Sequence, residues 1–161
     1  MLGQETGTYA ETLDAEMMRS MTNVEGELKL PFDLTLRSIF GFDYMNNNTR
    51  EFWAPLSVNG SSMNGMGQRW NYTNKTMTSS TTLNYAKTFG EHNVSAFVGF
   101  EAEKRNVFYM TAQSQNYATD KLPELSNGQS VDGGSDSSDA NMMSWLGSVN
   151  PKIRNYHPIH D

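Results

Sequence analysis

Two pairs of segments in this chain alternate apolar and polar side chains at period two, and a very short break joins the members of each pair. Residues 22–30 alternate in this way, and the pattern resumes over residues 34–44 after the break at 31–33. A second pair surrounds residues 89–93. Alternation at period two is typical of β-strands that present one apolar and one polar face. The apolar members of the first pair are Val24, Leu28, Leu30, Leu34, Leu36, Phe40, Phe42 and Tyr44.

The other connections are long and polar. Residues 45–75 are rich in Asn, Gly and Ser, and residues 105–140 end in the acidic low-complexity run 132–139. Short turns at one rim and long loops at the other are typical of outer-membrane β-barrels. We therefore predict an all-β fold, an antiparallel meander of five strands with long loops that forms a segment of a transmembrane β-barrel. The strands are expected near residues 22–30, 33–45, 76–88, 94–105 and 141–149.

The segments that flank this partial β-barrel, residues 22–150, follow other patterns. Thr8 and Glu11 have the spacing of a helix capping box, and apolar residues recur after them at four-residue steps. Residues 1–21 are therefore predicted to form a loop or a short helix. Residues 151–161 contain two prolines and no periodicity, so they are predicted to be a non-periodic tail.

Composition restricts the possible partners. The net charge is −6, which argues against a nucleic-acid partner because phosphate binding needs clustered Lys and Arg. The chain has no cysteine, so disulfides and thiolate metal sites are excluded. The first residues lack the basic start and apolar run of an export signal. An outer-membrane protein needs such a signal, so we expect this chain to be incomplete.

Three segments resemble strands of SusC/RagA-type TonB-dependent transporters from Bacteroidetes. They are residues 34–44, residues 83–101 with their Phe-Gly turn and following His92, and residues 144–150. The resemblance covers roughly residues 22–150 and consists of ordinary strand and turn residues, without a catalytic signature.

The resemblance implies an importer of oligosaccharides or peptides in the outer membrane. It also implies surrounding lipid, energy supplied through TonB and a SusD-like lipoprotein as partner. This chain would supply only about five strands of the later part of such a barrel and would not function alone. It departs from the family pattern at Pro151, where the family continues with an aromatic residue and more strand. A truncated or frameshifted reading frame would produce that departure.

Aromatic residues in the long polar segments are the candidate ligand-binding residues. Flat rings stack on sugar rings or apolar peptide side chains, and loops carry binding residues disproportionately. The alternative for those near strand ends is an aromatic girdle at the membrane interface. The candidates are Trp53, Trp70, Tyr72, Tyr109 and Tyr117.

The sequence offers no catalytic or metal-binding motif. His92 lies in a predicted turn, and His157 and His160 lie in the predicted tail beside prolines. The acidic run 132–139 does not match the ligand spacing of a calcium-binding loop. We predict no enzymatic activity, no metal and no cofactor.

A second function remains open from the sequence. A small soluble β-rich binding or adhesion domain, with the long loops as its recognition surface, would show the same alternation. The sheet face defined by Ser95, Gly99, Glu101 and Glu103 distinguishes the two hypotheses. A soluble sandwich packs the opposite, apolar face on protein and leaves this polar face in ordinary solvent, whereas in a barrel the apolar face meets lipid.

Overall fold

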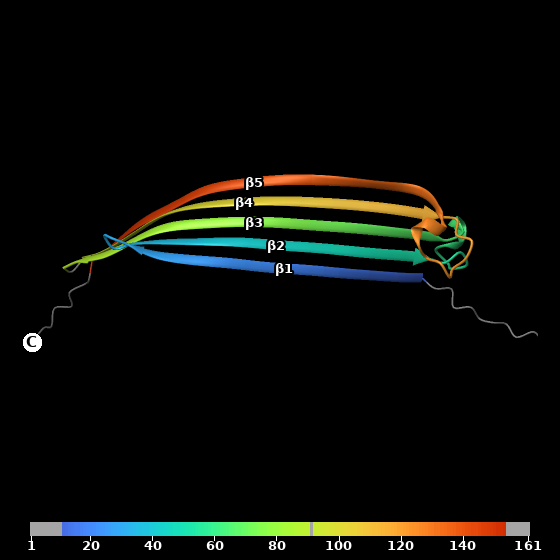
Figure 1. Cartoon of the computed structure of the whole chain (residues 1–161), viewed down its shortest axis with the longest axis horizontal. Coiled ribbons are helices and arrows are strands. Elements are labelled where there is room, and N and C mark those ends of the chain that lie inside the picture. Colours follow the sequence, from blue (N-terminus) through green and yellow to red (C-terminus); the bar gives the residue numbers. More distant parts are fainter. Residues whose placement is uncertain (1–10, 91, 154–161) are drawn as a thin grey trace, which may run out of the picture. The chain divides into compact units, whose positions relative to one another are not determined.

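The fold is a single sheet of five strands in the order β1-β2-β3-β4-β5 (Figure 1). The computed structural model describes residues 11–90 and 92–153. Each strand pairs with its sequence neighbour, so the sheet is an antiparallel meander and the predicted all-β fold is confirmed. The strands are β1 (Glu11–Leu30), β2 (Leu34–Trp53), β3 (Met66–Phe89), β4 (His92–Gln115) and β5 (Gln129–Ile153), with two 3-10 turns, η1 (Ser61–Met63) and η2 (Leu125–Asn127).

The chain divides into two compact units, and the strands contribute residues to both. Unit 1 contains the two long connections, and unit 2 contains the two tight turns. Unit 1 comprises residues 1–20, 44–74 and 106–138, and unit 2 comprises residues 21–43, 75–105 and 139–161.

The two tight turns occur where the sequence predicts them. Between β1 and β2, Phe32 and Asp33 adopt positive φ angles of 69° and 60°. Between β3 and β4, Gly90 has a φ of 58°, a conformation that glycine adopts without a steric penalty. Residue 91 lies outside the described residues.

The strands are longer than predicted, so several predicted boundaries are wrong. Residues 11–21 belong to β1 and form neither a loop nor a helix, whereas residues 1–10 lie outside the described part. The predicted loops shrink to residues 54–65 and 116–128. The added strand residues mix polar and apolar side chains on both faces, which hides the alternation, but they still pair through backbone hydrogen bonds.

Two further predictions, both about residues in β5, are wrong. The acidic run 132–139 was predicted as loop but lies within this strand. The predicted tail 151–161 is also wrong at its start, because β5 continues through Pro151 to Ile153. β5 pairs only with β4, and an edge strand tolerates proline when the missing N–H faces away from the ladder. Residues 154–161 lie outside the described residues.

Unit 2 has two faces of different chemistry. Side-chain contacts fix the register: Ser38 Oγ lies 2.9 Å from Thr81 Oγ1 on one face, and Arg37 Nε donates to Glu25 Oε1 at 2.7 Å on the other. We call the first the apolar face. By strand alternation it carries Val24, Leu28, Leu34, Leu36, Phe40, Phe42, Met77, Leu83, Tyr85, Val94, Ala96, Val98, Phe100, Met143, Trp145 and Val149.

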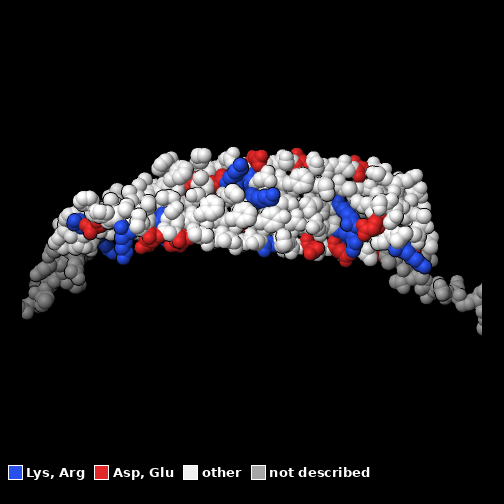
Figure 2. Space-filling view, viewed as in Figure 1, with Lys and Arg blue, Asp and Glu red and all other residues white. Residues whose placement is uncertain are grey.

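The opposite face of unit 2, the polar face, carries charged and hydroxyl side chains. Ser80 Oγ, for example, donates to Glu101 Oε1 at 3.3 Å. The large apolar exceptions on this face are Met21, Ile39, Phe97, Met142 and Leu146. In the space-filling view, charged residues are scattered and uncharged ones make up most of the visible surface (Figure 2).

The small packed core lies in unit 1. Among the described residues, the buried hydrophobic ones are Phe52, Ala54, Met66 and Tyr117. The apolar face of unit 2 has no such core, and Trp145 is 76% exposed there. An extended apolar face that covers no core requires either an apolar partner or an apolar environment.

Candidate functional site

One face of unit 1, which we call the aromatic face, holds most of the predicted ligand-binding residues. Gln68 Nε2 donates to Gln113 Oε1 at 3.0 Å across β3 and β4, which fixes the register of these strands. Counting outward from this pair places Tyr72 opposite Tyr109 and places Trp70 on the same face.

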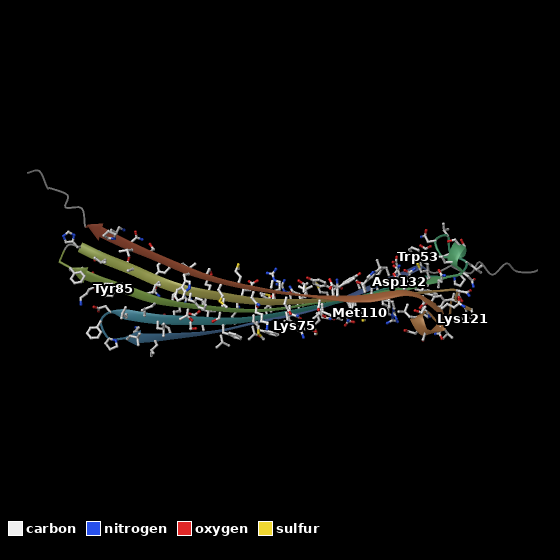
Figure 3. All side chains as sticks on the ribbon, turned by 90° about the horizontal axis from the view of Figure 1, so that it is seen from above. Trp53, Lys75, Tyr85, Met110, Lys121 and Asp132 are labelled. Carbon is white, nitrogen blue, oxygen red and sulfur yellow. The ribbon has the colours of Figure 1, made fainter. Side chains whose placement is uncertain are left out.

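The aromatic residues differ in exposure. Trp70 and Tyr72 are half-buried, and Tyr109 is 39% exposed. Trp53 shares this face by strand alternation. It lies at the loop end of β2, where its Nε1 donates to Glu51 Oε1 at 3.1 Å (Figure 3). The structure therefore brings Trp70, Tyr72 and Tyr109 together and places Trp53 closer to the loops.

Tyr117 does not belong to this surface, so it is not grouped with the other predicted ligand contacts. Its side chain is 1% exposed and packs edge-on against Phe52, with ring centroids 5.1 Å apart. A Cβ atom at Gly128 would lie 2.9 Å from Cε2 of Tyr117, so the ring occupies space that only glycine leaves free. We call the cluster of Phe52, Ala54 and Tyr117 the loop core, and Tyr117 is its centre.

Hydrogen bonds join the two long loops to each other around Tyr117. The Tyr117 amide donates to the Asn64 carbonyl at 2.8 Å, and the Asn116 amide donates to the Met63 carbonyl at 3.0 Å. Asn64 Nδ2 also donates to Asn116 Oδ1 at 2.8 Å. The buried Tyr117 hydroxyl has no hydrogen-bond partner among the described residues, and burial raises the pKa of this phenol.

The opposite face of unit 1 carries a closed ring of four hydrogen bonds. Asn46 Nδ2 donates to Thr73 Oγ1 at 2.8 Å, and Thr73 Oγ1 donates to Asn71 Oδ1 at 3.2 Å. Asn71 then donates to Asn48, and Asn48 Nδ2 donates to Asn46 Oδ1 at 3.0 Å, which closes the ring. Each member donates once and accepts once within this asparagine ring.

An ion-pair network lies on the same face as the asparagine ring. Arg50 contacts Asp14 at 2.7 Å and Glu124 at 3.6 Å, and Arg69 also pairs with Glu124. The network ties β1, β2 and β3 to the segment before η2. These side chains are partly exposed, so each pair contributes at most about 1 kcal/mol. Their main effect is to hold the guanidinium groups in place.

The ring and the network border a pocket of about 540 Å³. Amides, carboxylates and guanidinium groups supply both donors and acceptors, which suits a hydroxylated or peptide ligand. Residues 46–51 are all polar, so no alternation in the sequence indicates this strand face. The pocket is lined by Asp14, Glu16, Asn48, Thr49, Arg50, Arg69, Trp70, Asn71 and Met110.

Replacing Thr73 by valine is expected to destabilise unit 1 by about 1–3 kcal/mol, because it leaves Asn46 Nδ2 and Asn71 Oδ1 without their partner. Thr73→Ser keeps the hydroxyl and serves as the control. Hydrogen exchange of the β2 and β3 amides measures the difference. Equal exchange in the two variants would show that the ring does not stabilise the sheet.

Other kinds of site find no support in the described residues. Residues 11–90 and 92–153 contain no group of three or more His, Cys, Asp or Glu side chains placed to hold a metal ion. No helix in this part of the chain is long and apolar enough to cross a membrane.

The strands define the class of fold, an antiparallel meander like part of a barrel-type transporter. A solved structure of the RagAB peptide transporter matches it with a TM-score of 0.83 and 19% identity, over 91% of this chain and 17% of that chain. The RagAB peptide importer in its open-open state matches with a TM-score of 0.81 and 18% identity, over 91% of this chain and 17% of that one. The RagAB peptide importer in its closed-closed state matches with a TM-score of 0.80 and 19% identity, over 89% of this chain and 16% of that one.

The likeness to these structures concerns the fold, and this chain spans about 17% of the length of the RagAB chain. No family model and no curated protein match the chain.

Proposed function

We propose that this chain forms part of the barrel wall of an outer-membrane importer of peptides or oligosaccharides. By its resemblance to SusC/RagA-type transporters, the complete importer would use TonB as energy source and a SusD-like lipoprotein as partner. This segment would contribute to transport only within the complete barrel. The fold supports the proposal, because the RagAB peptide importer contains a similar meander.

The width of the apolar face carries the proposal. On β3, this face lies between Lys75 and Lys87, which enclose residues 76–86. On β4 it runs from Val94 to Ala102, and Lys104 is the next residue on the same face. A tilted strand needs about 9–11 residues to cross the hydrocarbon core of a bilayer. The apolar face of unit 2 therefore has the width of a bilayer.

One pair of polar groups within this band supports a water-free environment. Ser38 and Thr81 lie in the middle of the apolar face, and their hydroxyl oxygens are 2.9 Å apart, within hydrogen-bonding distance. Polar groups in a hydrocarbon environment need partners within the protein, because lipid chains offer none. The paired hydroxyls satisfy this requirement.

The tight-turn rim has the residues of a membrane interface. Lys87 Nζ pairs with Asp33 Oδ2 at 2.9 Å and lies 5.6 Å from the centroid of the Phe89 ring. Phe32 is 84% exposed. Aromatic rings and snorkelling lysines are typical of the zone where hydrocarbon gives way to head groups.

We further propose that the aromatic face of unit 1 contacts the imported ligand. Trp70, Tyr72 and Tyr109 offer ring surfaces, and Gln68 and Gln113 add amide donors and acceptors beside them. This combination suits peptide backbones and sugar hydroxyls equally. A girdle role is better suited to the aromatic residues near the lysine-bordered band than to this amide-rich surface.

The soluble-domain alternative conflicts with the exposure of unit 2. A soluble sandwich would cover the apolar face with a second layer, whereas the described strands all belong to one sheet. The decisive measurement is expression of the chain without detergent. A soluble monomer that unfolds cooperatively would overturn the barrel proposal.

Brominated lipids test the membrane placement directly. With Trp53 and Trp70 replaced by phenylalanine, the remaining Trp145 is expected to be strongly quenched in vesicles of acyl-brominated phosphatidylcholine, because it stands on the apolar face. The complementary variant Trp145→Phe keeps only the two tryptophans of unit 1 and is expected to show little quenching. Equal quenching of the two variants would contradict the assignment of unit 2 to the bilayer.

A further inference from the structure

We propose that the apolar face of unit 2 binds one anionic membrane lipid. Lys75 and Lys104 would hold its phosphate, and a groove beside Trp145 would take one acyl chain. This inference rests on the proposed membrane location of unit 2 and goes beyond it, because a barrel wall can contact lipid without selecting any.

The two lysines form the head-group part of the site. The Ser80–Glu101 contact at 3.3 Å fixes the register of β3 and β4. Met77 therefore lies opposite Lys104, and Lys75 is the diagonal neighbour of Lys104. Diagonal neighbours on one face are about 7–8 Å apart, a spacing that one phosphate group can bridge. Neither lysine makes an ion pair with a residue in the described ranges.

The groove forms the acyl-chain part of the site. It has a volume of about 470 Å³ and no charged residue in its lining. Trp145 lines the groove and tilts against Phe100, with ring centroids 4.9 Å apart and 53° between the ring planes. The lining residues are Leu36, Thr81, Leu83, Val98, Gly99, Phe100 and Trp145.

The head-group and acyl-chain parts lie at the spacing of a lipid. Lys104 and Phe100 share one strand face four residues apart, which corresponds to about 13 Å along β4. A phosphate at the lysines therefore extends its chain across Ala102 toward the groove. Asp139 shares this face on β5 but is engaged by a partner of its own.

Competition between brominated lipids tests the site in vesicles that contain the whole chain. The reporter is Trp145 in the Trp53→Phe/Trp70→Phe background. Brominated phosphatidylglycerol is expected to quench it at about one-tenth of the mole fraction that brominated phosphatidylcholine requires, because each lysine favours anionic lipid by about fivefold at most. Inorganic phosphate is not expected to relieve the quenching, since the acyl chain supplies part of the affinity.

Substitutions separate the two parts of the site. Lys75→Gln/Lys104→Gln is expected to remove the tenfold preference while leaving quenching by both lipids. Lys29→Gln/Lys121→Gln removes the same charge elsewhere and is expected to keep the preference. Val98→Phe fills the groove and is expected to reduce quenching several-fold. Val149→Phe lies on the same face outside the groove and is expected to leave quenching unchanged.

The outcomes distinguish this inference from the proposed function. If Trp145 is quenched equally by both lipids, the selective site is refuted and the membrane location stands. If neither lipid quenches it, the membrane location itself fails. A preference that survives the Lys75→Gln/Lys104→Gln exchange would also refute the head-group assignment.

Discussion

Replacing Tyr117 by alanine is expected to undock the two long loops from each other. The ring fills the centre of the loop core against Phe52, and removing a buried aromatic side chain costs about 3–5 kcal/mol. Amide hydrogen exchange in residues 54–65 and 116–128 should therefore accelerate by about 100-fold or more. The tight turns of unit 2 serve as the internal reference and should exchange at an unchanged rate.

Tyr117→Phe is the matched control for this prediction. The Tyr117 hydroxyl has no partner among the described residues, so its removal is expected to leave the loops docked or slightly more stable. Burial raises the phenol pKa above its ordinary value of 10.0. The neutral phenol is therefore favoured in the folded loops, and docking should weaken as pH rises above about 10 in the parent but not in Tyr117→Phe. Similar acceleration in the alanine and phenylalanine variants would refute a packing role for the ring.

Placing a charge on the apolar face is expected to block membrane insertion. Val98 lies near the middle of the band on β4, and an arginine at the bilayer midplane of a barrel costs about 2–4 kcal/mol. Val98→Arg should therefore lower the fraction of chain that co-floats with phospholipid vesicles by about 30-fold or more when insertion is marginal. The measurement is vesicle flotation followed by quantification of the bound chain.

Ser95→Arg provides the comparison on the same strand. Ser95 is exposed on the opposite, polar face, where a charge meets water or polar side chains. This variant should float with vesicles as the parent chain does. If both arginine variants were lost from vesicles equally, the two faces would not differ in their environment, and the lipid assignment would be wrong.

The sequence predicts the strands well where side chains alternate and poorly where they do not. Leu34–Tyr44 alternates apolar and polar residues, and it lies within β2 as expected. Residues 46–48 are all asparagine, so no pattern shows that β2 continues through them. Their strand conformation follows from pairing with β3, where Asn46 meets Thr73, and such pairing overrides local propensity.

The candidate site could be predicted only in part. Trp70, Tyr72 and Tyr109 were recognisable as aromatic residues in polar surroundings, but their common face depends on strands extending into the predicted loops. The Arg50–Glu124 contact joins residues distant in sequence, so it requires the cross-strand register. Tyr117 looks like the other aromatic residues in the sequence. Its burial results from the docking of two loops and the space left by nearby glycines.

In the proposed barrel wall, the lysines that border the apolar face on β3 would also determine how well the wall fits a given membrane. Lys75 and Lys87 are 12 residues apart, which corresponds to about 40 Å along an extended strand and about 28 Å across a bilayer at a 45° tilt. A thicker membrane would draw both ammonium groups toward hydrocarbon, and a thinner one would expose apolar side chains to water. Either mismatch costs a fraction of a kcal/mol per ångström, so in the proposed wall this pair of residues would favour membranes of one thickness over others.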